Sequence, residues 1–223
     1  GSEFEAPRLV QRGANDLIAD ALFDRQRLAG EHQFVHGGGA LDGGNAAYMW
    51  MLNICAGDVS LERMVISDSA PSFTGAMVMA TGEVDVAECA FFNNVGSDYA
   101  TSGLSITGDW HEGSPLPRVN MRDSNFRANG SGLYADRVEE IIIHACEFVD
   151  NIVPGMDPVA CPGVGISGPE GHPLNASVIG SLFRGNGIGA EFVGSSLLTV
   201  NSCQFLDNMA EGLLAADTDG GGL

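Results

Sequence analysis

The sequence contains no lysine, and all ten of its basic residues are arginine. Against these stand 29 acidic residues, which gives a formal net charge of −19. Nucleic acids and anionic membranes bind proteins through basic patches, so a chain this acidic is expected to bind neither. No apolar run approaches the roughly 20 residues that a membrane span needs. An apolar share of 44% over 223 residues is nevertheless enough to form a buried core.

The chain repeats itself. The same Phe-x-x-Asn word occurs five times, at Phe91/Asn94, Phe126/Asn129, Phe148/Asn151, Phe183/Asn186 and Phe205/Asn208. The spacings between these phenylalanines are 35, 22, 35 and 22, which sum in pairs to 57, so the repeating unit is a double one. Cysteine follows the same period, at Cys89, Cys146 and Cys203, each two residues before its phenylalanine. Units of this length are typical of solenoid proteins, in which each unit packs on the next.

Each unit has the pattern of short β-strands. Apolar residues alternate with polar ones before each phenylalanine, as at Val84/Val86 and Ile141/Ile143. A second short strand led by glycine follows each asparagine, as at Gly132-Leu133-Tyr134. A period of two places one face inside and one outside. With no helical pattern between residues 57 and 223, the sequence predicts an all-β protein, a parallel β-helix of about six coils.

Stacked coils set like residues on like at about 4.8 Å. We therefore expect the phenylalanines to fill the interior and the asparagines to form a hydrogen-bonded ladder at a turn. Cys89, Cys146 and Cys203 would lie about 9.6 Å apart, beyond the reach of a disulfide, and so act as buried apolar groups. The pairing of Cys55 and Cys161 stays open.

These Cys-x-Phe-x-x-Asn coils, from about residue 57 to 219, resemble those of right-handed parallel β-helix proteins of the pectate-lyase-like class. The Phe-x-x-Asn words together with Gly38-Gly39-Ala40-Leu41 are also similar to repeats of chlamydial polymorphic outer-membrane proteins, although this chain carries the Gly-Gly-Ala word once. The resemblance implies a right-handed parallel β-helix solenoid. It implies a shape and not an activity, because the class includes polysaccharide lyases, epimerases, hydrolases, phage tailspikes and surface adhesins.

Four segments are predicted. Residues 1–4 are interpreted as a cloning scar, 5–56 as an N-terminal capping helix and entry coil, 57–219 as the parallel β-helix, and 220–223 as a tail. The helix is expected over residues 14–29, where an apolar stripe runs between Asn15 and Gly30, and it would cover an open sheet end. A partner-binding helix is the alternative. No C-terminal cap is apparent, which leaves a fragment of a longer protein and end-to-end self-association both open.

Function is expected in the insertions by which the longer coils exceed the shorter ones, since long loops on a rigid scaffold commonly carry it. The two copies of the insertion should emerge on the same side, about 10 Å apart along the axis. The candidate binding residues are Tyr99, Asp109, Trp110, His111, Glu112, Asp157, Glu170 and His172. Tyr99 and Trp110 would contact the ligand, because exposed aromatics stack on sugars and anchor interfaces. A Trp110 ring folded back over the solenoid wall is equally open.

No catalytic residue, metal ligand or cofactor is assigned, and calcium is left possible at Asp217-Thr218-Asp219-Gly220. His111, Glu112, Glu170 and His172 have zinc-binding atoms but lack a tight ligand spacing. Abstraction of a proton beside a uronate needs a cation and a base, and a surface of charge −19 repels polyuronates. Glycoside hydrolysis needs two carboxylates about 5–10 Å apart, for which Asp109 and Glu170 are available.

The leading hypothesis is a noncatalytic, secreted or cell-surface β-helix scaffold that binds a glycan or a surface protein through its loop side. The alternative is a polysaccharide-active enzyme, either a lyase, an epimerase or a glycoside hydrolase, with a groove along the helix. An extracellular or cell-surface location is expected in both cases.

Overall fold

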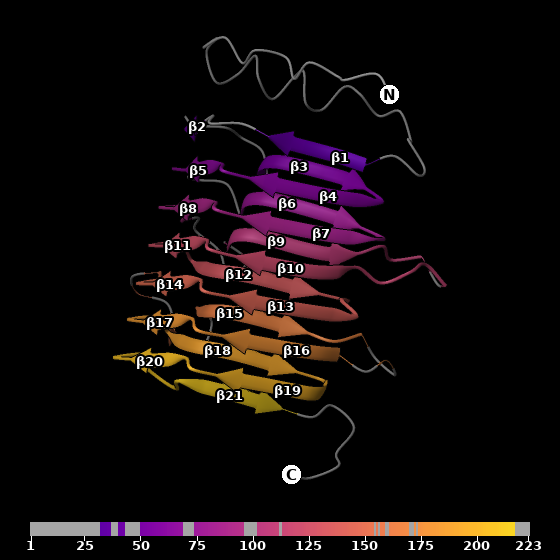
Figure 1. The fold of residues 1–223 in the computed structure, drawn as a ribbon. Helices are drawn as coiled ribbons and strands as arrows, with labels where there is room; N and C mark the ends of the chain where they lie inside the picture. The colour runs from indigo at the N-terminus through magenta and orange to yellow at the C-terminus, as the bar shows by residue number, and fades with distance from the viewer. Residues whose placement is uncertain are drawn as a thin grey trace.

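The computed structural model describes residues 32–36, 40–42, 50–68, 74–95, 102–111, 113–153, 155, 157–158, 161–169, 172 and 174–216. These ranges contain 21 β-strands and no α-helix (Figure 1). Within them, no helix is long and apolar enough to cross a membrane. The predicted capping helix over residues 14–29 and the predicted tail over 220–223 lie outside the described residues.

The strands form three parallel sheets of seven strands each. Sheet A contains β1 (His32–His36), β4 (Asp58–Glu62), β7 (Glu83–Ala87), β10 (Arg118–Arg122), β13 (Glu140–His144), β16 (Leu174–Ile179) and β19 (Ser195–Asn201). Sheet B contains the short strands β2 (Ala40–Asp42), β5 (Val65–Ser67), β8 (Ala90–Phe92), β11 (Asn125–Arg127), β14 (Glu147–Val149), β17 (Leu182–Arg184) and β20 (Gln204–Leu206). Sheet C contains β3 (Trp50–Ala56), β6 (Thr74–Ala80), β9 (Ser102–Gly108), β12 (Ser131–Asp136), β15 (Pro162–Ser167), β18 (Ile188–Val193) and β21 (Leu213–Ala216).

Consecutive strands of the chain belong to consecutive sheets, so three strands make one coil and each coil stacks on the one before it (Figure 1). This arrangement agrees with the parallel β-helix that the repeats predict. Strands β4 to β21 run from Asp58 to Ala216, within the segment predicted as the β-helix. Strands β1 to β3 lie in the segment predicted to hold the entry coil.

The phenylalanines form one stack through the interior, as predicted. Register pairs each with the phenylalanine of the next coil, from Phe91 to Phe205. Successive ring centroids lie 4.7–5.1 Å apart with interplanar angles of 6–10°. The first four rings are fully buried, whereas Phe205 in the last coil is partly exposed. The stack spacing matches the strand spacing, so the rings and the backbone share one repeat along the axis.

The asparagine ladder is also confirmed. Each side-chain amide donates to the Oδ1 of the next asparagine at 2.9–3.1 Å, through Asn94, Asn129, Asn151, Asn186 and Asn208. The same amide nitrogen donates to a backbone carbonyl of the preceding coil, as Asn129 does to Phe91 at 3.0 Å. Asn94, Asn129, Asn151 and Asn186 are buried, so the ladder satisfies polar groups that water cannot reach.

A second column alternates cysteine with serine. The residues two positions before each phenylalanine are Cys89, Ser124, Cys146, Ser181 and Cys203. Ser124 Oγ accepts the backbone N–H of Cys89 at 3.1 Å, and Ser181 Oγ accepts that of Cys146 at 3.2 Å. None of the chain's cysteines, all of which lie in described segments, forms a disulfide, and this includes Cys55 and Cys161. Burial raises the pKa of Cys146 to about 12, so this thiol stays protonated and packs as an apolar group.

The chain turns from sheet A to sheet B at the residue directly before this column. That residue adopts a left-handed backbone conformation in every coil from β4 onward. The residues there are Arg63, Glu88, Asp123, Ala145, Gly180 and Ser202, with φ between 50° and 59°. A side chain in this region costs roughly 1–2 kcal/mol relative to glycine, and Gly180 shows that the corner accepts glycine.

We therefore expect Ala145→Gly to raise the free energy of unfolding by about 1 kcal/mol, because it removes that penalty at φ 52°. Urea unfolding monitored by circular dichroism measures the change. Ala90→Gly, in strand β8, is the matched control and should lower the stability by about 0.5–1 kcal/mol. Loss of stability in both variants would contradict the expected gain.

Candidate functional site

Two long loops leave the same corner of the solenoid, between sheets C and A. Residues 109–117 connect β9 to β10, and residues 168–173 connect β15 to β16. The short turn 137–139, between β12 and β13, lies in the coil between them. The two loops are therefore two coils, or about 10 Å, apart along the axis, as predicted (Figure 1). This corner carries the predicted site residues Asp109, Trp110, His111 and His172.

The remaining inserted residues lie at a different corner, between sheets B and C. Residues 93–101 connect β8 to β9 and contain Tyr99, and residues 150–161 connect β14 to β15 and contain Asp157. Strand β9 separates the two corners, and its seven residues span about 20 Å. Each predicted insertion is thus divided between two corners, and Asp157 does not share a site with Asp109. Tyr99, Glu112 and Glu170 lie outside the described residues.

Asp109 braces the first loop. Its Oδ1 lies 2.6 Å from His111 Nδ1 and accepts the His111 backbone N–H at 3.2 Å, while its Oδ2 accepts the Ser114 hydroxyl at 2.9 Å. The Ser114 backbone N–H closes the loop by donating to the His111 carbonyl at 3.1 Å. Because Ser114 donates to the aspartate and not to the histidine, the trio lacks the nucleophile–base contact of an acyl-transfer site. Its role is to fix the loop that carries Trp110.

These hydrogen bonds, that of the His111 ring first, lower the pKa of Asp109 to about 2. The folded pKa lies below the usual unfolded value near 3.9, so the carboxylate stabilises the loop above that pH. This contribution is expected to disappear as the pH falls through about 2. Carbon-detected NMR should give an Asp109 midpoint near 2, and Ser114→Ala should raise it. An unshifted midpoint in the native protein would contradict the bracing by Asp109.

Trp110 presents an aromatic surface at this corner. Its side chain is 61% exposed, and the Arg137 guanidinium carbon lies 5.2 Å from its ring centroid. That distance is within the range of a cation–π contact. Arg137 Nε is buried and has no hydrogen-bond partner in the described part of the chain. The ring therefore rests on the neighbouring turn and still leaves most of its surface accessible.

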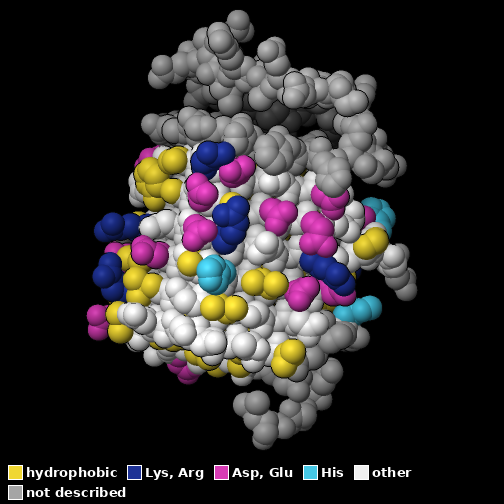
Figure 2. Space-filling view, in the orientation of Figure 1, with side chains coloured by type: hydrophobic (Ala, Val, Ile, Leu, Met, Phe, Trp, Pro, Cys, Tyr) yellow, Lys and Arg dark blue, Asp and Glu magenta, His cyan; other side chains and the backbone are white. Residues whose placement is uncertain are grey.

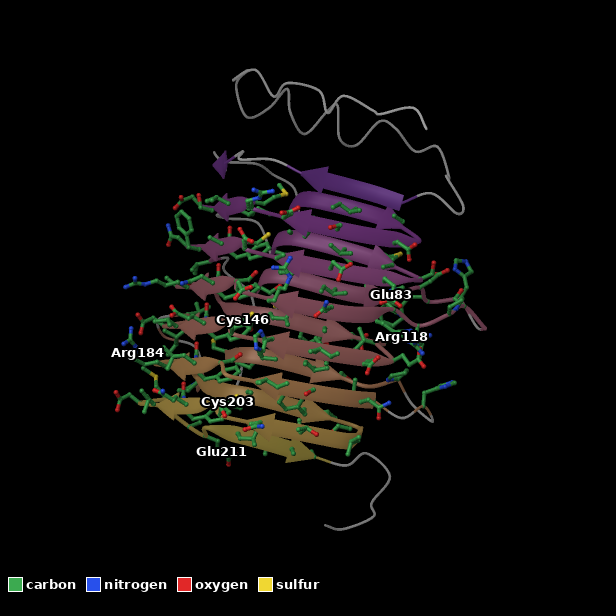
Figure 3. The ribbon with its side chains drawn as sticks, in the orientation of Figure 1. Glu83, Arg118, Cys146, Arg184, Cys203 and Glu211 are labelled. Carbon is green, nitrogen blue, oxygen red and sulfur yellow. The ribbon has the colours of Figure 1, made fainter. Side chains whose placement is uncertain are left out.

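The outward face of sheet A is polar and begins beside these loops. Arg118, which is labelled in Figure 3, is the first residue of β10. Its guanidinium forms two hydrogen bonds with Glu139 of the turn 137–139, at 3.0 and 3.1 Å. This pairing raises the pKa of Arg118 and lowers that of Glu139. Both side chains are about half exposed, so the pair contributes little stability. Figure 2 shows acidic and basic side chains interspersed across the described part of the face in view.

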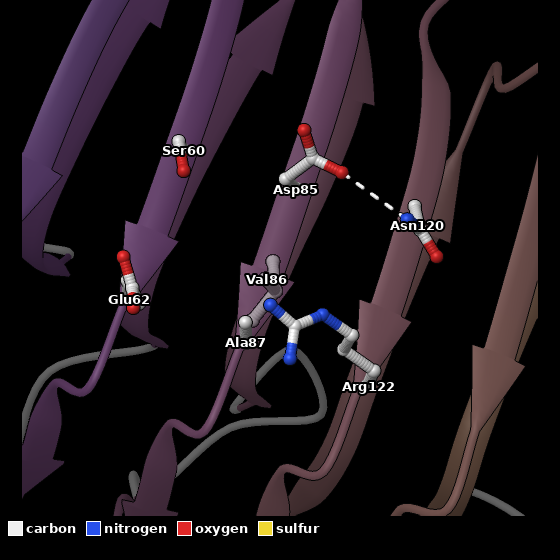
Figure 4. A pocket seen from close by; sticks show the side chains of 7 residues that line it. All are labelled: Ser60, Glu62, Asp85, Val86, Ala87, Asn120 and Arg122. Atoms are coloured by element: carbon white, nitrogen blue, oxygen red, sulfur yellow. Dashed lines mark hydrogen bonds between the residues drawn. The ribbon is translucent and has the colours of Figure 1, made fainter.

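A shallow pocket of about 240 Å³ lies farther along the same face, over β4, β7 and β10 (Figure 4). Its lining residues are Ser60, Glu62, Asp85, Val86, Ala87, Asn120 and Arg122. Register places the small Ala87 between Glu62 and Arg122, which leaves the hollow. In the neighbouring register row, which contains Ser60, Asp85 and Asn120, Asn120 Nδ2 donates to Asp85 Oδ1 at 3.3 Å. Sequence reasoning missed this pocket, although the alternation of Val84 and Val86 already places Asp85 and Ala87 outside.

A second polar cluster lies on the outward face of sheet C. Tyr134 and Glu191 stand on either side of Gly165 in one register row, and Asp136 pairs with Ser167 in the next. Burial raises the pKa of both carboxyl groups and that of the Tyr134 phenol. Raised carboxyl pKa values are common at catalytic sites, although structural groups also show them. The sequence signal for this cluster is the acidic residues at outward positions of the glycine-led strands.

Within the described ranges, no three His, Cys, Asp or Glu side chains gather closely enough to hold a metal ion. The predicted calcium position at 217–220 lies outside those ranges. Comparisons of the chain with protein-family models, with curated proteins and with solved structures give no match.

Proposed function

We propose that this protein is a noncatalytic solenoid scaffold that binds a neutral glycan through the corner formed by residues 109–117, 137–139 and 168–173. The observation that carries the proposal is the exposed Trp110 ring on a loop braced by Asp109. A ring already fixed in place loses little conformational entropy when a sugar stacks on it. The proposal includes a right-handed fold of the pectate-lyase-like class, since crossovers between parallel strands are almost always right-handed.

The charge and the pocket support a neutral ligand. The chain carries 29 acidic and ten basic residues, so a polyuronate would meet net repulsion. The sheet A pocket offers carboxylate, amide, hydroxyl and guanidinium groups that can bond sugar hydroxyls. Its volume of about 240 Å³ is below the roughly 300 Å³ or more of typical ligand pockets, which suits part of a sugar chain.

A secreted or cell-surface location belongs to the same proposal. Stacked coils make a rigid support that presents its loops at one corner, which suits recognition of ligands on other surfaces. A surface protein carrying such a glycan is a partner of the same kind.

The test is titration of a neutral-glycan panel against the native protein and Trp110→Ala. Loss of the stacking surface should weaken binding about tenfold, which corresponds to about 1.4 kcal/mol. Phe92→Ala is the matched control, because Phe92 is an exposed aromatic on β8 of sheet B, away from the corner between sheets C and A, and should leave the affinity unchanged. Equal binding by native protein and Trp110→Ala would contradict the proposal, as would binding of no member of the panel.

The alternative function, a polysaccharide-active enzyme, is favoured by the raised carboxyl pKa values of Asp136 and Glu191. The general acid of a glycoside hydrolase is a carboxyl group whose pKa lies above its usual value. The same glycan incubations distinguish the two functions when they are analysed for shorter products. Product that disappears with Asp136→Asn or Glu191→Gln, and persists with Trp110→Ala, would establish the enzyme in place of the scaffold.

A further inference from the structure

The sheet A pocket contains opposite charges that do not pair with each other. Asp85 and Arg122 both line it, and within the described residues no ion pair joins them. The carboxylates closest to Arg122 are those of Glu88 and Asp123. The Arg122 side chain extends from β10 toward Ala87, which lies at the centre of the hollow (Figure 4). A carboxylate and a guanidinium therefore line one hollow without neutralising each other.

The Arg122 guanidinium has one edge without a partner among the described residues. Its contacts with carboxylates use Nη1, which lies 3.5 Å from Asp123 Oδ2 and 3.9 Å from Glu88 Oε1. No described residue bonds to its Nε or Nη2. In Arg118 the same two nitrogens bind the two carboxylate oxygens of Glu139. The corresponding edge of Arg122 can bind the carboxylate of a ligand in the same two-point way.

Asp85 supplies the complementary group. Its Oδ1 accepts from Asn120 Nδ2 at 3.3 Å, whereas its Oδ2 has no partner in the part of the chain that the structure describes. Glu62, the other acidic residue of the lining, already pairs with Arg63 at 2.8 Å. Ser60 is the register neighbour of Asp85 and adds a hydroxyl to the same wall. A protonated amine could therefore donate to the Asp85 carboxylate and to Ser60 Oγ.

A ligand that carries both charges suits this pocket better than a ligand with one. A carboxylate alone would meet the repulsion of 29 acidic against ten basic residues, and an amine alone would leave the open edge of Arg122 unused. We propose that the sheet A pocket binds a zwitterionic sugar unit, whose ammonium group pairs with Asp85 and whose carboxylate pairs with Arg122. This inference rests on the proposed function, in which the pocket holds part of the glycan. Such a unit has no net charge and so belongs to a neutral glycan.

The test is a titration of four sugars that share one ring. Glucosaminuronic acid carries both charges, glucosamine carries the ammonium alone, glucuronic acid carries the carboxylate alone, and glucose carries neither. At about pH 6 the amines are protonated and the carboxyl groups ionised. The native protein should bind glucosaminuronic acid about tenfold more tightly than each of the other three, because only this sugar makes both charged contacts. The readout is the NMR chemical shift of Ala87 in the pocket.

Each charge has a matched variant. Arg122→Gln should reduce the advantage of glucosaminuronic acid over glucosamine to about twofold or less, because the carboxylate loses its partner. Asp85→Asn should do the same to its advantage over glucuronic acid, and asparagine keeps an oxygen that can accept from Asn120. Arg184→Gln, on β17 of sheet B, is the control for a lost positive charge and should keep both advantages.

Equal binding of the four sugars by the native protein would overturn the proposal. So would no binding of glucosaminuronic acid at about 50 mM, a concentration that fills a site of millimolar affinity. An advantage that persists in Arg122→Gln or in Asp85→Asn would show that the named groups do not read the charges. Tighter binding of alanine, which carries the same two charges without a sugar ring, would overturn the sugar in favour of a free amino acid.

The outcome is separable from that of the glycan test. Trp110 does not line the pocket, so Trp110→Ala should leave the four titrations unchanged. Charge selectivity in the pocket together with equal glycan binding by native protein and Trp110→Ala would contradict the proposed function alone. Glycan binding that depends on Trp110, without charge selectivity in the pocket, would overturn this inference alone.

Discussion

Gly163→Ala is expected to lower the free energy of unfolding by about 3 kcal/mol or more. A Cβ at this position of β15 would lie 2.6 Å from the Gly189 carbonyl oxygen and 2.9 Å from Asn186 Nδ2. Neither group can move without disturbing the sheet or the asparagine ladder, so overpacking here costs at least as much as in an ordinary core. This crowding explains why glycine leads the strand that follows each asparagine. Urea unfolding, followed by far-ultraviolet circular dichroism, measures the loss.

Gly57→Ala is the matched control, because an added Cβ there has no neighbour within 4 Å. It should leave the stability within about 1 kcal/mol of the native value. Similar losses of stability in the two variants would show that crowding against the asparagine ladder is not the reason for the glycine in the strand that follows each asparagine. The same conclusion would follow if Gly163→Ala had the same urea midpoint of unfolding as the native protein.

Asn151→Ala is expected to cost about 4 kcal/mol, since it removes the middle of the ladder. Asn151 donates to Asn186 Oδ1 at 2.9 Å and to the Phe126 carbonyl at 3.0 Å. It also accepts two hydrogen bonds from Asn129, at 3.0 and 3.1 Å. Its loss strands the Asn129 donors and the Phe126 carbonyl in a buried site, at roughly 1–3 kcal/mol for each unsatisfied group. Calorimetric or urea unfolding would measure the effect.

The control for this variant is Asn175→Ala, because Asn175 is exposed on the outer face of β16. Its replacement should change the stability by no more than about 0.5 kcal/mol. Amide exchange adds a local test, since the Asn129 N–H loses its acceptor in Asn151→Ala and should exchange faster. A protected Asn129 amide in that variant would contradict the role of the Asn151 side chain as its acceptor.

The strands could be predicted because like residues stack on like. Phe91, Phe126 and Phe148 recur at spacings that only a coil can bring into register, and the structure pairs them as the spacing requires. The interior needs apolar side chains and the turn needs amides. At these positions the type of residue and its spacing along the chain therefore predict the same coil. Two features of the coils were not predicted from the sequence. They are the hydrogen bonds between the cysteine and serine positions and the left-handed backbone conformation at the corners. Arg63, Ala145 and Ser202 share a conformation but no side-chain chemistry, so no residue pattern marks those corners.

The candidate site could be predicted less completely. The length difference between the two kinds of coil indicates an insertion but not how it is divided between two corners, and that division separates Asp157 from Asp109. The pocket over Ala87 depends on which outward residues become neighbours across coils. Neighbours of this kind follow from register, and register follows from the spacing of the repeats. Asp85 and Asn120 could have been paired in this way, because their separation along the chain, 35, equals the longer repeat spacing.

The alternation of cysteine and serine bears on how such a chain can change its length during evolution. Deleting residues 124–180, which make up one double unit, would join Asp123 to Ser181 and set Cys89 under a serine again. Deleting a single coil, whether a long or a short one, would instead place cysteine under cysteine or serine under serine. Recombination between genes for such chains should therefore preserve pairs of coils, and natural length variants should differ by whole multiples of that double unit.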